Sequence, residues 1–305
     1  MRMPRQLVQC AANFSEGRDL SVVNRIVEAA AGRHGAYVAD WSSDADHNRM
    51  VLTLVGEPVA VAQAILSAAA AAVASIDMRS HRGVHPRLGA VDVVPFTPLR
   101  EMDMDDANGL ARVVGKRLAE TLQLPVFFYE RSAASGRAQD LPTLRKGGFE
   151  GASGIDLRPD VGPRRVHPTA GAAVVGAREP LVAFNVNLAE ADPTPARLIA
   201  SNIRRVRADI PELSGVRALG LALAGRGMSQ VSLNLTRPAA GPLPFIFDQI
   251  CAAAEGLGIV VAESELIGLA PASVFGGEPA DRVLCTGFAP TQLTDFWLSL
   301  PVDRN

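Results

Sequence analysis

The sequence predicts a fold of the α+β class, an α/β sandwich in which two similar βαββαβ units follow one another. Two observations carry this prediction. Short apolar runs that suit β-strands alternate with helical runs, and the same order recurs in both halves of the 305-residue chain. A chain of this length also suits about two domains. We therefore expect subdomains at 1–180 and 181–305, joined near 178–190, although the halves share no repeated sequence.

The first half has the pattern of a split βαβ motif, which is the ferredoxin-like arrangement, followed by a further helix and strand. Asp19 or Ser21 can cap its first helix, and Pro58 suits the first position of its second. Residues 131–170 show no periodicity, and a stretch of that length is usually functional or disordered. The predicted strands lie at 7–14, 36–41, 50–55, 90–96 and 124–129, and the predicted helices at about 19–31, 59–76 and 105–122.

Two strands of the second half alternate amides with apolar residues, at 184–188 and 230–235. Period two places the amides on one face, where they line a groove between the subdomains or simply face solvent. We expect the groove, with the apolar partners buried under helices. The amides are Asn185, Asn187, Gln230 and Asn234. Further elements are predicted at 171–175, 196–208, 216–223, 245–256 and 259–262, with Thr194 as the cap of the helix at 196–208 and Pro195 at its first position.

Composition excludes several classes of function. The chain is 48% apolar and 20% charged, with a net charge of −2, so no broad basic field exists to hold nucleic acid or an anionic membrane. The alanine-rich run at 59–76 favours a helix packed on a sheet over a membrane span. Three scattered cysteines without a C-x-x-C motif, and no apolar signal sequence, favour a cytoplasmic protein with free thiols.

One loop concentrates cations: His81 and His85 lie among Arg79, Arg82 and Arg87. Such groups repel one another when charged, so this loop is either solvated or organised around an anion. The histidines have the i, i+4 spacing of a helical zinc pair, but Gly83 and Pro86 oppose a helix and no carboxylate completes the set. We therefore expect no metal. Nucleotide-binding and α/β-hydrolase motifs are also absent from the sequence.

An acidic loop follows the strand at 36–41 and contains Asp44 and Asp46. It lacks the glycine and the terminal glutamate of a calcium-binding loop. Two interpretations remain open: a polar turn, or carboxylates that face a cationic substrate.

Ten short strings in order resemble the glutamate formimidoyltransferase family, and the resemblance spans about residues 7–271. Each string is weak alone, but the ordered set at compatible spacing is specific. The strings are Asn13–Gly17, His47–Arg49, Ile76–Met78, His85–Ala90, Asp92–Phe96, Leu141–Arg145, Gly171–Arg178, Phe184–Leu188, Gln230–Leu235 and Glu263–Leu269.

The resemblance implies two α/β subdomains with a folate tunnel between them, a homodimer, and a role in histidine degradation and one-carbon metabolism. It implies transfer of a formimidoyl group from N-formimidoyl-L-glutamate to N5 of tetrahydrofolate as co-substrate, giving 5-formimidoyltetrahydrofolate and glutamate. Alternatives are a formyl donor, another amino acid, or a folate-binding protein without turnover. The cyclodeaminase domain found in vertebrate relatives is not expected here.

The family's catalytic histidine falls at His85, and its folate segment at Gly162, Pro163, Arg164, Arg165, Val166, His167, Pro168, Thr169, Ala170 and Gly171. The family's acidic position aligns with Ser42, so the resemblance implies that Asp40, Asp44 or Asp46 orients the cationic amidine instead. The carboxylates of the substrate and of folate, which we expect to be polyglutamylated, require cationic or amide partners. Besides the acidic candidates, the residues that we assign to the substrate are Asn48, Arg49, Arg82, Arg178, Asn185, Asn187, Gln230 and Asn234.

Overall fold

The computed structural model describes residues 3–137 and 139–302, and the chain divides into two compact units. The first comprises Met1–Glu179 with Leu300–Asn305, and the second comprises Pro180–Ser299. The end of the chain therefore groups with the first unit, whereas we expected it in the second. The reason is a backbone contact, since the Met3 amide donates to the Pro301 carbonyl at 2.7 Å and Met3 pairs with Val302.

The first unit is built on a six-stranded sheet in the order β2-β3-β1-β4-β6-β5. Its first four strands are antiparallel and have the order of a ferredoxin-like sheet, whereas β5 and β6 extend that sheet in parallel. The elements are β1 (Leu7–Phe14), α1 (Leu20–Ala30), β2 (Ala36–Asp44), β3 (Arg49–Gly56), α2 (Pro58–Ser75), β4 (Val91–Arg100), α3 (Met104–Leu122), β5 (Val126–Glu130), α4 (Leu141–Leu144), α5 (Gly148–Ala152) and β6 (Ala173–Ala177).

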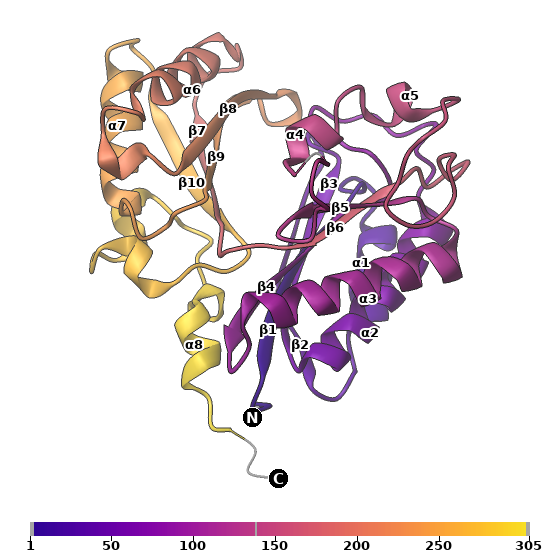
Figure 1. Ribbon diagram of the computed structural model, residues 1–305. Helices are drawn as coiled ribbons and strands as arrows, with labels where there is room; N and C mark the ends of the chain where they lie inside the picture. The colour runs from indigo at the N-terminus through magenta and orange to yellow at the C-terminus, as the bar shows by residue number, and fades with distance from the viewer. Residues whose placement is uncertain (1–2, 138, 303–305) are drawn as a thin grey trace. The chain divides into compact units, whose positions relative to one another are not determined.

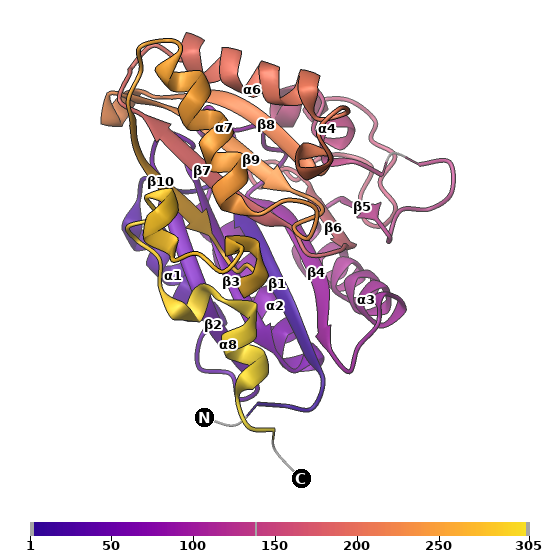
Figure 2. The same ribbon diagram turned by 90° about the vertical axis from the view of Figure 1, so that its left-hand side faces the viewer.

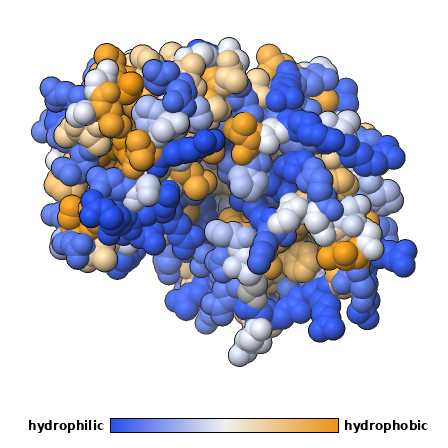
Figure 3. Space-filling model, turned by 90° about the horizontal axis from the view of Figure 1, so that it is seen from above, coloured by the Kyte–Doolittle hydropathy of each residue, from blue (hydrophilic) through white to orange (hydrophobic). Residues whose placement is uncertain are grey.

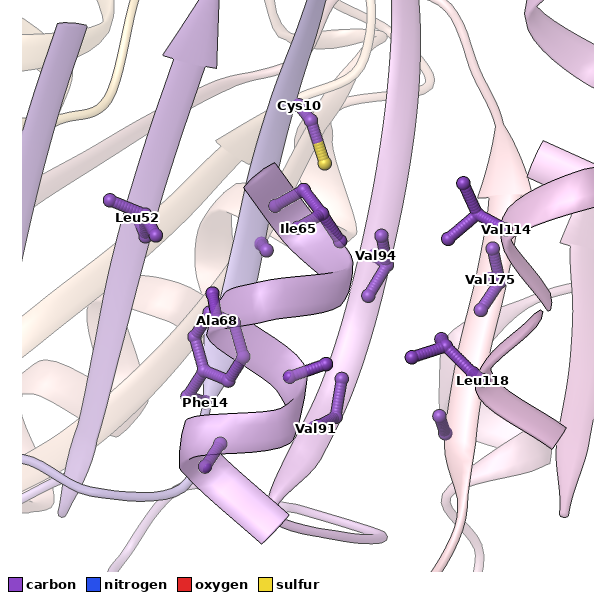
Figure 4. Close-up of a cluster of buried hydrophobic side chains, with 14 of the residues drawn as sticks. Cys10, Phe14, Leu52, Ile65, Ala68, Val91, Val94, Val114, Leu118 and Val175 are labelled. Atoms are coloured by element: carbon purple, nitrogen blue, oxygen red, sulfur yellow. The ribbon is translucent and has the colours of Figure 1, made fainter. Parts of the chain in front are cut away.

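Helices α1, α2 and α3 cover one face of this sheet (Figure 1). Figure 4 shows Ile65 of α2 near Val94 of β4, Ala68 of α2 near Phe14 of β1, and Leu118 of α3 near Val175 of β6. Helix α2 is long and apolar enough to suit a membrane span by composition, but it packs on β1 and between α1 and α3. Small alanine side chains permit this close approach.

Local signals place several helix ends as predicted. The Asp19 side chain accepts the amides of Ser21 and Val22, and Pro58 stands at the start of α2. Strand β2 continues to Asp44, beyond the predicted end at Trp41, because Ser42 pairs with Val51 across the ladder. The expected polar loop is therefore reduced to a tight turn at residues 45–48.

The aperiodic region 131–170 forms short helices and loops on the other face of the sheet. Helices α4 and α5 belong to it, and its residues pack around Val93, Tyr129 and Val174. This second, smaller core covers the sheet over β4, β5 and β6. Loop composition alone did not reveal it, because its apolar residues are too sparse to show a period.

The second unit repeats the order of the first four strands, as β10-β7-β9-β8. Figure 2 shows α6 and α7 lying on one face of this sheet. The predicted alternation is confirmed, because Phe184, Val186, Val231 and Leu233 are all buried in that core. The main elements are β7 (Val182–Leu188), α6 (Thr194–Val206), β8 (Val216–Leu223), β9 (Met228–Leu235), α7 (Leu243–Glu255), β10 (Val261–Ile267) and α8 (Thr294–Ser299).

Two expectations for this unit were wrong in position. Helix α6 begins at Thr194, two residues before the predicted start. Asp192 accepts the Thr194 amide at 2.9 Å, and Thr194 lies inside the helix rather than capping it. Strand β10 occupies 261–267 rather than 259–262. Its alternating glutamates, Glu263 and Glu265, hid the strand signal because acidic residues are poor strand formers.

Hydrophilic and hydrophobic side chains lie side by side on one face of the molecule (Figure 3). Hydrophilic side chains predominate on the face seen in Figure 3, and hydrophobic residues occur among them in small groups. Such scattered apolar exposure is ordinary for a globular protein.

We predict that Ala68→Leu lowers the free energy of unfolding by about 1–3 kcal/mol, because Ala68 is fully buried between α2 and the sheet and the larger side chain overpacks that contact. Ala70→Leu is the matched control, since Ala70 is exposed on the same helix. Thermal unfolding of both variants provides the measurement. Equal unfolding midpoints would contradict the close packing of α2.

Candidate functional site

His85 lies in the loop between α2 and β4, and both of its ring nitrogens have partners. Nδ1 is 2.7 Å from the Pro86 carbonyl oxygen, and Nε2 is 2.6 Å from Nη1 of Arg49. A carbonyl only accepts hydrogen bonds and a guanidinium only donates them. The ring is therefore neutral, with its proton on Nδ1 and its lone pair on Nε2.

The surroundings of His85 hold its pKa well below the usual value for histidine. Removal from water is the main cause, followed by the positive charges of Arg49 and Arg145 and by the neighbouring His47. The two imidazole rings lie 5.9 Å apart between centroids. His85 is thus kept as an unprotonated base at neutral pH, and it is still partly accessible to solvent.

His81 lies four residues before His85, and both of its ring nitrogens make hydrogen bonds that hold the loop. Its Nε2 donates to the Asn48 carbonyl at 2.8 Å, and its Nδ1 accepts from Nε of Arg87 at 3.1 Å. Arg87 in turn pairs with Glu150 at 2.6 Å. Burial lowers the pKa of His81. No group of three or more metal-binding side chains occurs within residues 3–137 and 139–302.

Asn48 joins three segments of chain around His85. It has a φ of 48°, in the left-handed region that turns the chain sharply from β2 into β3. Its Oδ1 accepts the Gly17 amide at 3.0 Å, and its Nδ2 donates to the Arg82 carbonyl at 2.9 Å. A Cβ on Gly83 would lie 2.2 Å from the His47 carbonyl oxygen, so glycine is needed for this approach. Asn48 is a scaffold, and its predicted contact with substrate stays a prediction.

The ion pair between Asp92 and Arg145, beside His85, was not among the predicted site residues. Asp92 of β4 is 1% exposed and pairs with Arg145, which follows α4. Asp92 also accepts the Leu88 amide at 2.7 Å and so fixes the chain just after His85. The buried Nε of Arg145 has no hydrogen-bond partner among the described residues. A carboxylate within the apolar strand at 90–96 was the signal that could have revealed this pair.

The other predicted substrate residues of the first unit lie at different points around the sheet and loops. Asp40 pairs in register with Thr53, on the face away from the helices, where the buried Oγ1 of Thr53 has no hydrogen-bond partner in the described chain. Arg178 follows β6 and lies by the buried Tyr129, whose pKa is raised by burial. The carbonyl of Asp46 accepts the Val84 amide at 3.2 Å. The Arg82 side chain is exposed and donates to backbone carbonyls of its own loop.

The segment 162–171, predicted to bind folate, folds against the His85 loop within the first unit. Thr169 accepts the Met78 amide at 2.7 Å, and Gly171 bridges to Gly89. Gly171 has a φ of 72°, which favours glycine, and a Cβ there would meet the Leu88 carbonyl at 2.4 Å. Arg164 pairs with Asp156 in solvent, and Arg165 is exposed. The segment is thus a firmly tied turn with cationic side chains on its outside.

The predicted amides of the second unit form part of a hydrogen-bonded polar network on one face of its sheet. Gln230 donates to Oδ1 of Asn187 at 2.9 Å and to Glu265 at 3.0 Å, and Asn185 also donates to Glu265 at 3.0 Å. Asn187 donates to Glu263 at 3.1 Å. These three amides are buried, whereas Asn234 shares their face but is exposed. Their placement against a groove between the units stays a prediction.

The glutamates of this network were not predicted. Glu263 lies directly opposite Asn187, and Glu265 opposite Asn185, so both carboxylates share the amide face. Arg226 completes the network by pairing with Glu263. The alternation of glutamates at 263 and 265 with apolar residues was the available signal.

We predict that Asp92→Ala destabilises the protein by about 3–5 kcal/mol, because it leaves the Arg145 guanidinium buried without its counter-charge. Asp156→Ala is the control, since the side chains of its ion pair with Arg164 are 63% and 65% exposed and such pairs contribute less than about 1 kcal/mol. Denaturant unfolding compares the two variants. Losses of equal size would argue against a structural role for the buried pair.

Several curated proteins are similar to this chain over most of its length. A glutamate formimidoyltransferase from Streptococcus pyogenes serotype M1 is 40% identical over 271 residues, covering 88% of this chain and 90% of that protein. One from Thermoplasma acidophilum is 38% identical, covering 87% and 88%. A formimidoyltransferase-cyclodeaminase from Sus scrofa is 40% identical, covering 87% of this chain and 50% of its own length. The chain therefore spans about half of that longer relative.

Two family models divide the chain much as the structure does. The N-terminal subdomain of the formiminotransferase domain matches residues 7–178, and the formiminotransferase domain model matches residues 183–277. The first match holds the His85 loop and the second holds the amide-bearing sheet. From these matches and the extent of its similarity to glutamate formimidoyltransferases, the chain belongs to the formiminotransferase family.

Proposed function

We propose that the protein is an enzyme that transfers the formimidoyl group of N-formimidoyl-L-glutamate to N5 of tetrahydrofolate, giving 5-formimidoyltetrahydrofolate and glutamate. The observation that carries the proposal is the neutral ring of His85, partly accessible and surrounded by arginines. The relatives named glutamate formimidoyltransferase support the same reaction.

The reaction requires that a proton be removed from N5 of tetrahydrofolate and that a proton be delivered to the departing nitrogen of glutamate. N5 of tetrahydrofolate attacks the formimidoyl carbon and loses its proton, and the nitrogen of glutamate gains one as its bond to that carbon breaks. Nε2 of His85 can accept the first proton and return it to the glutamate nitrogen. General acid–base catalysis of this kind typically contributes about 10²–10⁴-fold. The Pro86 carbonyl holds the ring through Nδ1, so the proton exchanges at Nε2 alone.

The carboxylates of the donor require cations close to His85. Arg49 contacts the ring, and Arg145 offers a buried Nε donor without a hydrogen-bond partner in the described residues. Arg178 adds a third positive charge near Tyr129. Guanidinium groups bind carboxylates through two parallel hydrogen bonds, which would orient the donor as well as hold it.

The amidine of the donor is cationic and suits an acidic partner. Asp40 is our choice, because it lies across the ladder from Thr53, whose buried hydroxyl could orient the same group. Asp46 is the alternative, in the turn that carries His47.

Folate recognition is assigned to two surfaces. The segment 162–171 presents Arg164 and Arg165 for the glutamate tail, which we take to be polyglutamylated. The network of Asn185, Asn187 and Gln230 offers donors and acceptors of the kind that a pterin edge requires. We further propose a homodimer in the cytoplasm that acts in histidine degradation, as the resemblance to the family implies. No resident metal is part of this proposal.

We predict that His85→Ala lowers kcat at least about 10²-fold, because the shuttling base is removed while the fold is retained. His34→Ala is the control, since His34 is exposed in the loop between α1 and β2. Folate spectra follow turnover, and circular dichroism checks the fold. A His85→Ala variant that kept more than about a tenth of the wild-type rate would exclude the base role.

We also predict that polyglutamylated tetrahydrofolate binds more tightly than the monoglutamate, with a difference that shrinks as salt rises. Exposed charges such as that of Arg165 are screened over about 8–10 Å at physiological ionic strength. Calorimetric titration of both ligands at low and high salt provides the test. Equal affinities at low salt would argue against a cationic path for the tail.

A further inference from the structure

We propose that Arg49 is a substrate-operated latch on His85: its guanidinium occupies the Nε2 lone pair until a carboxylate of the donor draws it away. The inference rests on the proposed function and assigns Arg49 a positioning role within it. Its basis is the 2.6 Å contact between Nη1 of Arg49 and Nε2 of His85.

In the structure as it stands, His85 cannot act as a base. The only unprotonated nitrogen of its ring is Nε2, because Nδ1 carries the proton that is donated to the Pro86 carbonyl. The lone pair of Nε2 accepts from Arg49, so no proton of a substrate can reach it. If Nε2 gained a proton, two N–H donors would face each other at the same contact. Arg49 must therefore move before proton transfer.

The side chain of Arg49 can move while its backbone stays in place. Arg49 begins β3 and pairs with Asp44 of β2. A Cβ on Gly17 would lie 2.6 Å from the Arg49 amide nitrogen, so a second segment packs directly on this backbone. Asn48, just before it, is held by hydrogen bonds on both sides. Because the anchor is fixed, a change at Arg49 is confined to its flexible side chain.

A carboxylate is the group that can take Arg49 from His85. A guanidinium–carboxylate pair has two charge-assisted hydrogen bonds, whereas the contact with a neutral imidazole has one neutral acceptor. The donor carries two carboxylates on its glutamate part. The same movement would expose Nε2 of His85. The carboxylate would also neutralise the charge of Arg49, which lowers the pKa of His85 more than any other charge. Substrate binding would therefore both free Nε2 and raise the pKa of His85.

None of the other described groups around His85 that the contacts identify donates to its Nε2. Arg145, approaching from the end of α4, is already paired with Asp92 of β4. His47 faces the ring from the turn at residues 45–48, and Pro86 supplies a carbonyl from the loop itself. Removal from water lowers the pKa of His85 most, and the charge of Arg49 has the next largest effect.

The test is an NMR titration of the full chain with ¹⁵N-labelled histidine, in which His85→Gln assigns the signals of His85. L-Glutamate is the probe, because it carries both carboxylates of the donor. We expect saturating L-glutamate to raise the pKa of His85 in the wild type. In Arg49→Gln, the pKa should be raised already without ligand, and added L-glutamate should change it little.

Arg18→Gln is the matched control, since Arg18 is an exposed cation of the neighbouring loop that donates to the Ala45 carbonyl rather than to His85. It should behave as the wild type. In steady-state kinetics, Arg49→Gln should raise KM for the donor about tenfold or more, since a charge-assisted contact is lost. It should also move the acidic limb of the kcat/KM profile to higher pH. Arg49→Lys should restore part of the affinity but not the forked contact.

Turnover of N-formimidoyl-L-glutamate with tetrahydrofolate is measured in parallel, so the two proposals can fail separately. Turnover combined with a pKa of His85 that L-glutamate shifts equally in wild type and Arg49→Gln overturns the latch and leaves the function. A saturating titration that shifts neither protein also overturns it. Absence of turnover overturns the proposed function, and the NMR comparison then still decides whether Arg49 controls His85.

Discussion

Each βαββαβ unit has long helices on only one face of its sheet, and this constraint determines what covers the other face. In the first unit α1, α2 and α3 bury the apolar face, and the opposite face must be covered by loops or carry polar residues. The short helices of region 131–170 cover part of it, and Asp40 and Thr53 lie on another part. In the second unit the face away from α6 and α7 bears the amide and glutamate network. Asp40 in the first unit and the amides of the second thus lie on sheet faces away from the long helices.

Two neighbouring histidines show how local contacts assign different roles to the same side chain. His81 is 6% exposed and uses both nitrogens to join the loop to Asn48 and Arg87. His85 uses one nitrogen for the backbone and presents the other to a side chain that can move. The acceptor nitrogen of His81 is held by Arg87, which Glu150 anchors, whereas that of His85 contacts Arg49.

Much of the fold followed from periodicity. Strand β1 and strand β8 were predicted to the residue, because each is an apolar run bounded by turn signals. The alternation at 184–188 and 230–235 correctly identified which apolar side chains enter the core under the helices. Strand β10 was misplaced because its polar positions are occupied by Glu263 and Glu265. These residues fit the alternation, but glutamate is rare in strands. The small core under residues 131–170 depends on long-range contacts that no local pattern encodes.

The site was harder to predict, since it depends on tautomers and on pairs distant in sequence. The cationic loop at 79–87 was visible as composition, and the resemblance singled out His85. The contact between Arg49 and His85 joins residues 36 positions apart, and that between Asp92 and Arg145 spans 53. The structural role of Asn48 was not predicted, because a left-handed backbone and contacts to Gly17 and Arg82 leave no local signal in the sequence, and its contact with substrate stays a prediction.

The pairing of Met3 with Val302 makes the second unit an insertion within the first. During synthesis from the N-terminus, the sheet from β1 to β6 can form before β7 exists, but the bridge from Met3 must wait until residues 301 and 302 have been made. Contacts so distant in sequence form late, because closing a long loop costs entropy before the contact repays it. The bridge between Met3 and Val302 therefore forms after the sheet of the unit that it joins.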